Sequence, residues 1–184
     1  LIQTSAHYFG LKPKFKSKLV DSGYYIFKKN DWKLIVDAGQ PGATYIPGHA
    51  HCDAMSFELF KAGKPIIVNC GTYAYQCAER NFFRSTAAHN TVMINNTEQS
   101  QCWSAFRLAK RSKIKVLSVS DDSIVMQMTD QKGQVVTRSI TFRDELVVKD
   151  ESDGNELSGY VHILQKINIK IYANQNTMTY HYSP

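Results

Sequence analysis

Residues 48–53, with the sequence GHAHCD, carry two histidines and a carboxylate at alternating positions. Alternate side chains of an extended segment share one face. We therefore expect His49, His51 and Asp53 to point one way, and Ala50 and Cys52 to point the other. Two imidazoles and a carboxylate on one face suit a zinc site, and they also suit proton transfer. The spacing predicts either a metal centre or an acid–base site.

This short pattern also has a plainer explanation, because a polar loop with hydrogen-bonded histidines can have the same composition. One specific rival is testable from the sequence. Metallo-β-lactamase-like hydrolases use the longer pattern HxHxDH, in which the last histidine binds a second metal ion. Ala54 stands at that position here, which argues against that class of hydrolase.

A second polar loop ends in His89, just before the strand-like run at residues 91–94. A side chain at a strand end is held by rigid backbone, as a ligand or catalytic group requires. Asn69 follows another apolar run, residues 65–68, and supplies a third polar edge. The loops that carry these residues are long for a strand-rich domain, and such loops are usually functional or disordered.

Three blocks of this sequence, in order, resemble the heparinase II/III-like family of polysaccharide lyases. The blocks are GHAHCDAMSF, a strand that closes in NCGTY, and RNFFRSTAAHNTV. The family pattern runs roughly H-x-H-x-D-x-L-S-F, D-x-G-T-Y and R-x-x-x-R-x-T-x-x-H-N-T-V, and the close match covers about residues 45–95. The resemblance implies an N-terminal α/α-toroid followed by a β-sandwich. It also implies β-elimination of uronic-acid-containing chains in the cleft between the two.

The resemblance further implies a metal site. Family members commonly hold zinc through two histidines and an aspartate, which correspond by position to His51, His89 and Asn69. Asn69 departs from the family aspartate, and an amide oxygen is a poorer zinc ligand than a carboxylate. Either Asp53 compensates as a further ligand, or the site is poor in metal.

Other roles follow from the same resemblance. His49 matches a histidine that faces the substrate, so it is the expected catalytic residue of this chain. Tyr75 and Arg84 fall where substrate contacts are expected. The family's catalytic tyrosine and asparagine would lie in the toroid, which this chain does not contain.

The formal net charge is +6 and the pI is near 9.1, which favours an acidic partner. Together with the resemblance, this charge predicts an anionic polysaccharide substrate. Charge alone also fits nucleic acid, but no DNA- or RNA-binding motif supports such a partner. No apolar run approaches the ~20 residues of a membrane span, so we expect none.

Leu1 is an unusual first residue for a natural chain. We therefore interpret residues 1–184 as a single domain, the C-terminal sandwich of a longer protein whose N-terminal toroid is missing. For the parent protein we expect a periplasmic or secreted location. The cysteines contain no CxxC pair, so they are interpreted as small buried hydrophobes with unassigned disulfide state. They are Cys52, Cys70, Cys77 and Cys102.

Short strand-like runs dominate the chain, so we predict an all-β fold, an antiparallel β-sandwich or stacked-sheet domain. Residues 24–27 and 32–36 read as a hairpin around a polar turn. After residue 112, strands recur at spacings near ten residues. These predicted strands are residues 114–119, 124–128, 135–142, 145–149, 160–164 and 167–172. Helix is expected only at residues 54–62, with a helical turn at 79–84.

A non-catalytic carbohydrate-binding module is the main alternative to a lyase. Such a module would present aromatic platforms to a sugar chain. The candidates are the loop residues Tyr45, Tyr73, Tyr75, Phe82 and Phe83. A lyase needs the histidines to converge in one cleft, whereas a binding module does not. Convergence of the histidines would therefore favour the lyase.

Overall fold

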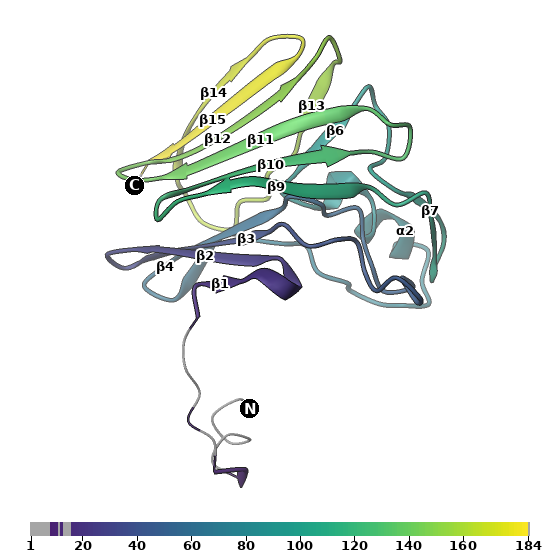
Figure 1. Ribbon diagram of the computed structural model, residues 1–184, viewed down its shortest axis with the longest axis horizontal. Coiled ribbons are helices and arrows are strands. Elements are labelled where there is room, and N and C mark those ends of the chain that lie inside the picture. Colours follow the sequence, from purple (N-terminus) through teal and green to yellow (C-terminus); the bar gives the residue numbers. More distant parts are fainter. Residues whose placement is uncertain (1–7, 11, 13–15, 184) are drawn as a thin grey trace.

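The computed structural model describes residues 8–10, 12 and 16–183. Figure 1 shows two sheets stacked face to face, with the shorter strands and the helix toward one end of the stack. Both large sheets are antiparallel throughout. The predicted all-β antiparallel sandwich is therefore confirmed.

The first sheet has five strands in the order β1-β2-β3-β4-β5. Their bounds are β1 Lys18–Leu19, β2 Tyr24–Lys29, β3 Trp32–Asp37, β4 Phe57–Lys61 and β5 Lys64–Ile67. Strands β2 and β3 form the predicted hairpin. Asn30 adopts a positive φ of 52° in its turn, a conformation that asparagine tolerates better than most residues.

The helix predicted at residues 54–62 was wrong. Residues 57–61 form strand β4, which lies between β3 and β5. Phe57 and Leu59 are buried while Glu58 and Phe60 are half-buried, which is the period-two pattern of a strand. Pairing along both edges outweighs the helix propensity of this short run.

The second sheet has six strands in the order β14-β15-β12-β11-β10-β9. Their bounds are β9 Lys113–Val119, β10 Ser123–Thr129, β11 Val135–Phe142, β12 Leu146–Ser152, β14 Asn168–Ala173 and β15 Thr177–Ser183. Five of them match predicted strands, and β15 was not anticipated. Side chains of β10 alternate strictly between buried and half-buried, which is why periodicity predicted this region well.

The strand predicted at residues 160–164 was also wrong. Only an isolated bridge between Ile67 and Ile163 forms there. The backbone of His162 instead forms two hydrogen bonds with the loops. Its carbonyl accepts from Val68 N at 3.0 Å, and its N–H donates to the Asn90 side-chain oxygen Oδ1 at 2.7 Å. The apolar run therefore serves as a connection that closes the sandwich beside the polar loops.

The remaining elements are short and carry the loops. They are η1 Val20–Ser22, α2 Arg80–Phe83, η2 Thr86–Ala88, β6 Val92–Ile94, β7 Gln101–Ser104, β8 Arg107–Ala109 and β13 Leu157–Gly159. Helix α2 corresponds to the predicted helical turn. Strand β6 pairs with β13, and β7 pairs with β8.

The hydrophobic core lies between the two large sheets. Leu34, Val36 and Phe57 of the first sheet share this core with Met126 and Val148 of the second. All five side chains are at most 2% exposed. In the part of the chain that the structure describes, no helix is long and apolar enough to cross a membrane.

Candidate functional site

His51, Asp53 and His89 come together in three dimensions although they are far apart in sequence. One ligand atom from each lies within 4.8 Å of the others. His51 Nδ1 and His89 Nε2 are 3.3 Å apart. Zinc–nitrogen bonds of about 2.0–2.1 Å at a tetrahedral angle would place two ligand nitrogens about 3.3–3.4 Å apart. The spacing of these two nitrogens matches that value, and the three residues, which we call the metal trio, lie close enough together to hold a metal ion.

Both histidines of the metal trio are held neutral at ordinary pH. Burial, followed by repulsion from His89 and Arg80 if the His51 ring becomes charged, lowers the pKa of His51 to about 4. Burial, followed by His162, lowers the pKa of His89 to about 4. Neutral imidazole is the form that binds metal. Burial also raises the pKa of Asp53, and a bound cation would offset that effect because it favours the carboxylate.

Arg80 fixes the proton of His51 when no metal is present. Its guanidinium is 1% exposed and donates from one NH group to His51 Nε2 at 3.0 Å. Arginine stays protonated, so Nε2 accepts and the ring proton resides on Nδ1, facing His89. Metal binding at Nδ1 requires this proton to leave or to move to Nε2. The Arg80 contact and metal ligation therefore compete for one ring.

His89 offers an unsatisfied polar atom to the same centre. Its side chain is completely buried, and Nδ1 has no hydrogen bond of ordinary geometry among the described residues. The Phe83 carbonyl is the group that favours protonation of this ring. Ligating histidines usually donate the second ring N–H to such a carbonyl. Ligation through Nε2 would therefore place the proton on Nδ1, facing Phe83.

Asn69 lies in the wall of the same cavity as His51 and Asp53. Its side-chain oxygen accepts from the backbone N–H of Gly71 at 2.8 Å, which holds the loop turn after β5. The carboxylate of the metal trio comes from Asp53. Ligation by Asn69 stays a prediction.

His49 lines this cavity, and Tyr75 packs against it. The His49 ring meets the Tyr75 ring edge-on at 5.2 Å between centroids, and it meets Phe106 at 5.7 Å. The Arg80 guanidinium lies over the Tyr75 ring at 5.1 Å. His49 is exposed and Tyr75 is 47% exposed. Both side chains are therefore accessible from solvent.

Arg84 occupies a different environment from the one expected of a substrate contact. Its side chain is 0% exposed. The guanidinium donates to the carbonyls of Ala50 at 3.0 Å and Ser104 at 2.6 Å, while the Arg84 carbonyl accepts from Cys52 N at 2.9 Å. Arg84 braces residues 49–53, here called the histidine loop, against strand β7. No guanidinium surface is left for a substrate.

A buried ion pair supports the loops from behind. Arg138 of β11 and Asp150 of β12 form two hydrogen bonds, at 2.7 and 2.8 Å, and both side chains are fully enclosed. One NH group of Arg138 also donates to the carbonyls of Met55 and Asn90, each at 2.9 Å. These carbonyls directly follow the two segments that supply the metal trio, so a single guanidinium fixes both.

Gln99 joins the same two segments on another side. Its side-chain oxygen accepts from Ala54 N at 3.0 Å, and its amide donates to Thr91 Oγ1 and the Val92 carbonyl, both at 3.0 Å. Gln99 is completely buried. Polar groups enclosed in this way rigidify their surroundings when every member is satisfied, so the ligands sit on a stiff support.

The cavity has an acidic wall that the sequence did not reveal. Tyr24, Asp37 and Gln40 line it together with His49 and Asp53, around a volume of about 350 Å³. Burial raises the pKa of Asp37 to about 6. The charge of Asp37, followed by burial, raises the pKa of Tyr24 to about 12. Asp37 ends the predicted strand at 32–36, so its position at a strand end was the available signal.

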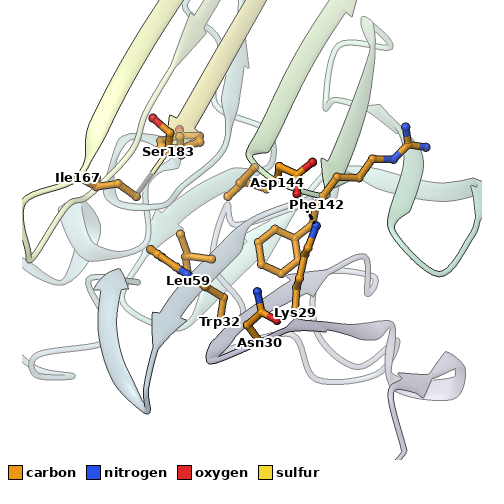
Figure 2. A pocket seen from close by; sticks show the side chains of 11 residues that line it. Lys29, Asn30, Trp32, Leu59, Phe142, Asp144, Ile167 and Ser183 are labelled. Atoms are coloured by element: carbon orange, nitrogen blue, oxygen red, sulfur yellow. Dashed lines mark hydrogen bonds and ion pairs between the residues drawn. The ribbon is translucent and has the colours of Figure 1, made fainter.

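A second cavity of about 130 Å³ lies between the β2–β3 hairpin and the β11–β12 turn. Figure 2 shows Trp32, Leu59 and Phe142 around it, with Lys29 reaching toward Asp144. Lys29 Nζ and Asp144 Oδ1 are 2.8 Å apart and form an ion pair. Its lining among the described residues contains no histidine, so it lacks the metal-ligand chemistry of the first cavity.

Comparisons with known proteins agree with this arrangement. A family model described as Heparinase II/III-like, C-terminal matches residues 12–179. The chain belongs to this family. The heparinase II/III-like domain is 30% identical over 161 residues to a heparin-sulfate lyase of Bacteroides stercoris. That match covers 80% of this chain but 22% of the relative. A heparin-sulfate lyase of Pedobacter heparinus is 33% identical over 97 residues, which are 47% of this chain and 14% of that protein.

Solved structures share the fold of this heparinase II/III-like domain. A heparinase III gene product superimposes with a TM-score of 0.62 at 19% identity, over 94% of this chain and 34% of that one. The heparan sulfate lyase HepC of Pedobacter heparinus gives a TM-score of 0.56 at 16% identity, over 98% and 38%. The chain thus spans about a fifth of the first curated relative and about a third of these solved chains.

Proposed function

We propose that this domain forms the sheet side of the active site in a polysaccharide lyase that cleaves uronic-acid-containing, anionic chains by β-elimination. The observation that carries the proposal is a cavity lined by His49, His51 and Asp53, with the Tyr75 ring packed against His49. Family membership and the curated relatives, both heparin-sulfate lyases, support it. Convergence of His49 and His51 in one cavity favours this function over a binding module.

The chemistry of β-elimination gives these side chains separate tasks. The reaction removes the C5 proton of a uronic acid, and negative charge then develops on the carboxyl group. Preorganised donors that stabilise such charge are often the largest catalytic contribution. His49 is exposed and free to act as the donor or to transfer a proton. Tyr75 provides an aromatic face beside it, held by Arg80.

Zinc is the cofactor that we propose for the metal trio. His51, Asp53 and His89 would hold the ion, with Asn69 nearby in the cavity wall. A bound zinc ion would supply a fixed positive charge and cross-link the two loops. The domain's own residues keep the remaining tasks: Arg84 and Arg138 position the loops, and Gln99 joins them.

The catalytic cleft needs a second wall, and we propose that an N-terminal toroid of the same protein supplies it. The curated relatives are several times longer than this chain. Large aromatic side chains stand exposed on the loops and short elements, including Tyr73 at 76%, Phe82 of α2 at 57% and Trp103 of β7 at 61%. Such surfaces usually mark contacts with another domain or a ligand. A polymeric substrate outside the cytoplasm is consistent with the proposed periplasmic or secreted location.

A carbohydrate-binding module remains the second candidate, because the same exposed aromatics could stack on sugar rings. The experiment that separates the two uses the full-length parent protein on a panel of uronic-acid polymers. Lyase activity produces an unsaturated product that absorbs ultraviolet light. We expect this product from the wild type and at least a hundredfold slower release from His49→Ala, in line with the usual contribution of acid–base groups. Binding without any product would favour the module.

A further inference from the structure

We propose that Cys52 and Cys102 form a reversible disulfide that ties the histidine loop to strand β7. Their sulfur atoms lie 3.6 Å apart, although the residues are fifty positions apart in the chain. All four cysteines are reduced in this structure. A disulfide bond is about 2.05 Å long, so the two sulfurs must approach by about 1.5 Å to form one.

The positions of both cysteines suit a cross-link that leaves the cavity open. The cavity is lined by His49, His51 and Asp53 and not by Cys52, which instead directs its thiol to the Ser100 carbonyl at 3.4 Å. This is the alternation expected of an extended segment. Cys102 lies in β7, opposite Leu108 of β8. A bond between the two would therefore form behind the metal trio.

Access to solvent sets the order of the chemistry. Cys52 is completely buried, whereas Cys102 is partly exposed. A thiolate at Cys102 can attack a small disulfide such as glutathione disulfide, forming a mixed disulfide and releasing one glutathione thiol. The Cys52 sulfur then attacks the Cys102 sulfur and releases the second glutathione thiol. Two protein thiols are oxidised, one small disulfide is reduced to two thiols, and the thiol protons pass to the leaving groups or solvent.

The cross-link would act on the residues next to it. Cys52 lies between His51 and Asp53, and its backbone N–H already bonds the Arg84 carbonyl. A covalent bond would hold the histidine loop in its ligand-bearing conformation, which limits the disorder of the unfolded chain as well. This effect on the ligands rests on the proposed metal site, but formation of the disulfide does not.

The first test identifies the bond itself. The full chain is equilibrated in glutathione buffers from reducing to oxidising, free thiols are alkylated in denaturant, and the digest is mapped by mass spectrometry. We expect a cross-linked pair of peptides containing Cys52 and Cys102, lighter by two hydrogen atoms than the two reduced peptides. A double variant Cys70→Ser/Cys77→Ser is the matched control and should give the same pair. Full alkylation of Cys52 and Cys102 in the most oxidising buffer would overturn the proposal.

A second measurement follows the thermal midpoint in the double variant. Oxidation should raise Tm by roughly 5–15 °C, from the usual effect of a disulfide on a domain of this size. Adding Cys102→Ser should abolish the rise. An equal rise with Cys102 absent would contradict the assignment, and neither measurement depends on zinc or on lyase activity.

Discussion

His51 is the residue whose protonation distinguishes the metal-free site from a metal-bound one. Its Nδ1 faces His89 and its Nε2 accepts from Arg80, so both ring nitrogens are already used. The buried pair therefore has a stable arrangement without an ion. Zinc binding at Nδ1 requires its proton to leave or to move to Nε2, and protonation of the ligands at low pH should weaken metal binding.

The ligand set can be tested by exchanging carboxylate and amide groups. Asp53→Asn should weaken zinc binding roughly 10- to 100-fold or more, because an amide oxygen replaces a carboxylate ligand. Asn69→Ala is the matched control, and we expect a smaller loss since its side-chain oxygen already bonds Gly71. Competition titration against a coloured chelator measures both variants. A larger loss for Asn69→Ala would identify Asn69 as the ligand instead.

The depressed pKa values predict how pH affects the stability of metal-free protein. His51 and His89 have a pKa of about 4 in the folded chain and an ordinary value of 6.5. Between these values the unfolded state binds more protons, so the stability contributed by the neutral rings is complete above pH 6.5 and is lost as pH falls toward 4. In this range each ring can change the free energy of unfolding by up to about 1.4 kcal/mol per pH unit.

Urea unfolding from pH 4 to 7 measures this effect in chelator-treated protein. Asp37 acts in the opposite direction, because its folded pKa of about 6 lies above the ordinary carboxyl value. The informative quantity is therefore the difference between the wild type and His51→Gln/His89→Gln. We expect a shallower dependence on pH in that variant. Identical slopes in the wild type and that variant would refute the assignment.

At the scale of elements, strands β11 and β12 support the site through the Arg138–Asp150 pair. This pair holds the Met55 and Asn90 carbonyls from inside the sandwich. Burying two charges is costly, and removing one partner leaves the other uncompensated. The pair therefore connects the regular strands of the second sheet to the loops that carry the metal trio.

Substitutions of Arg138 and Asp150 should have effects on the free energy of unfolding that do not add. Arg138→Met should destabilise the domain by about 3–5 kcal/mol, because Asp150 would remain buried and unpaired. Arg138→Met/Asp150→Leu should recover much of that stability, yet it should not restore zinc affinity since the Met55 and Asn90 carbonyls stay unbound. Urea unfolding and the chelator titration measure the two effects separately. Full recovery of zinc affinity in the double variant would show that Arg138 does not position the loops.

At the scale of the whole molecule, the cavity that holds His49, His51 and Asp53 opens to solvent on this domain. A substrate carboxylate bound there would remain largely in water, where each electrostatic contact is weak. Orientation between catalytic groups can supply on the order of 7–11 kcal/mol of barrier lowering, and this needs the second wall of the cleft. The isolated domain should therefore bind polymer weakly.

We expect this 184-residue chain to be inactive alone. The test compares chain and full-length parent side by side on the parent's substrate, following ultraviolet absorbance of the unsaturated product. A circular dichroism spectrum dominated by β-structure serves as the control that the isolated chain is folded. Comparable turnover by the two proteins would show that the chemistry resides wholly in these residues.

The sequence by itself determined the sandwich and the family. Alternating burial in strands such as β10 is a local property, because neighbours on a strand face opposite sides of the sheet. The three motif blocks identified His49, His51 and His89 for the same reason: each block is contiguous in the chain. Strand β4 was missed because its short apolar run fits a helix equally well, and pairing with β3 and β5 decides between them.

Only the tertiary structure decided which groups meet. The approach of Asp53 to His89, the burial of Arg84 and the approach of Cys102 to Cys52 each depend on contacts between distant segments. Such contacts arise when backbone carbonyls and charged groups excluded from water must find partners inside the fold. The Arg138 guanidinium, which satisfies two loop carbonyls from a strand of the opposite sheet, has no counterpart in any local pattern.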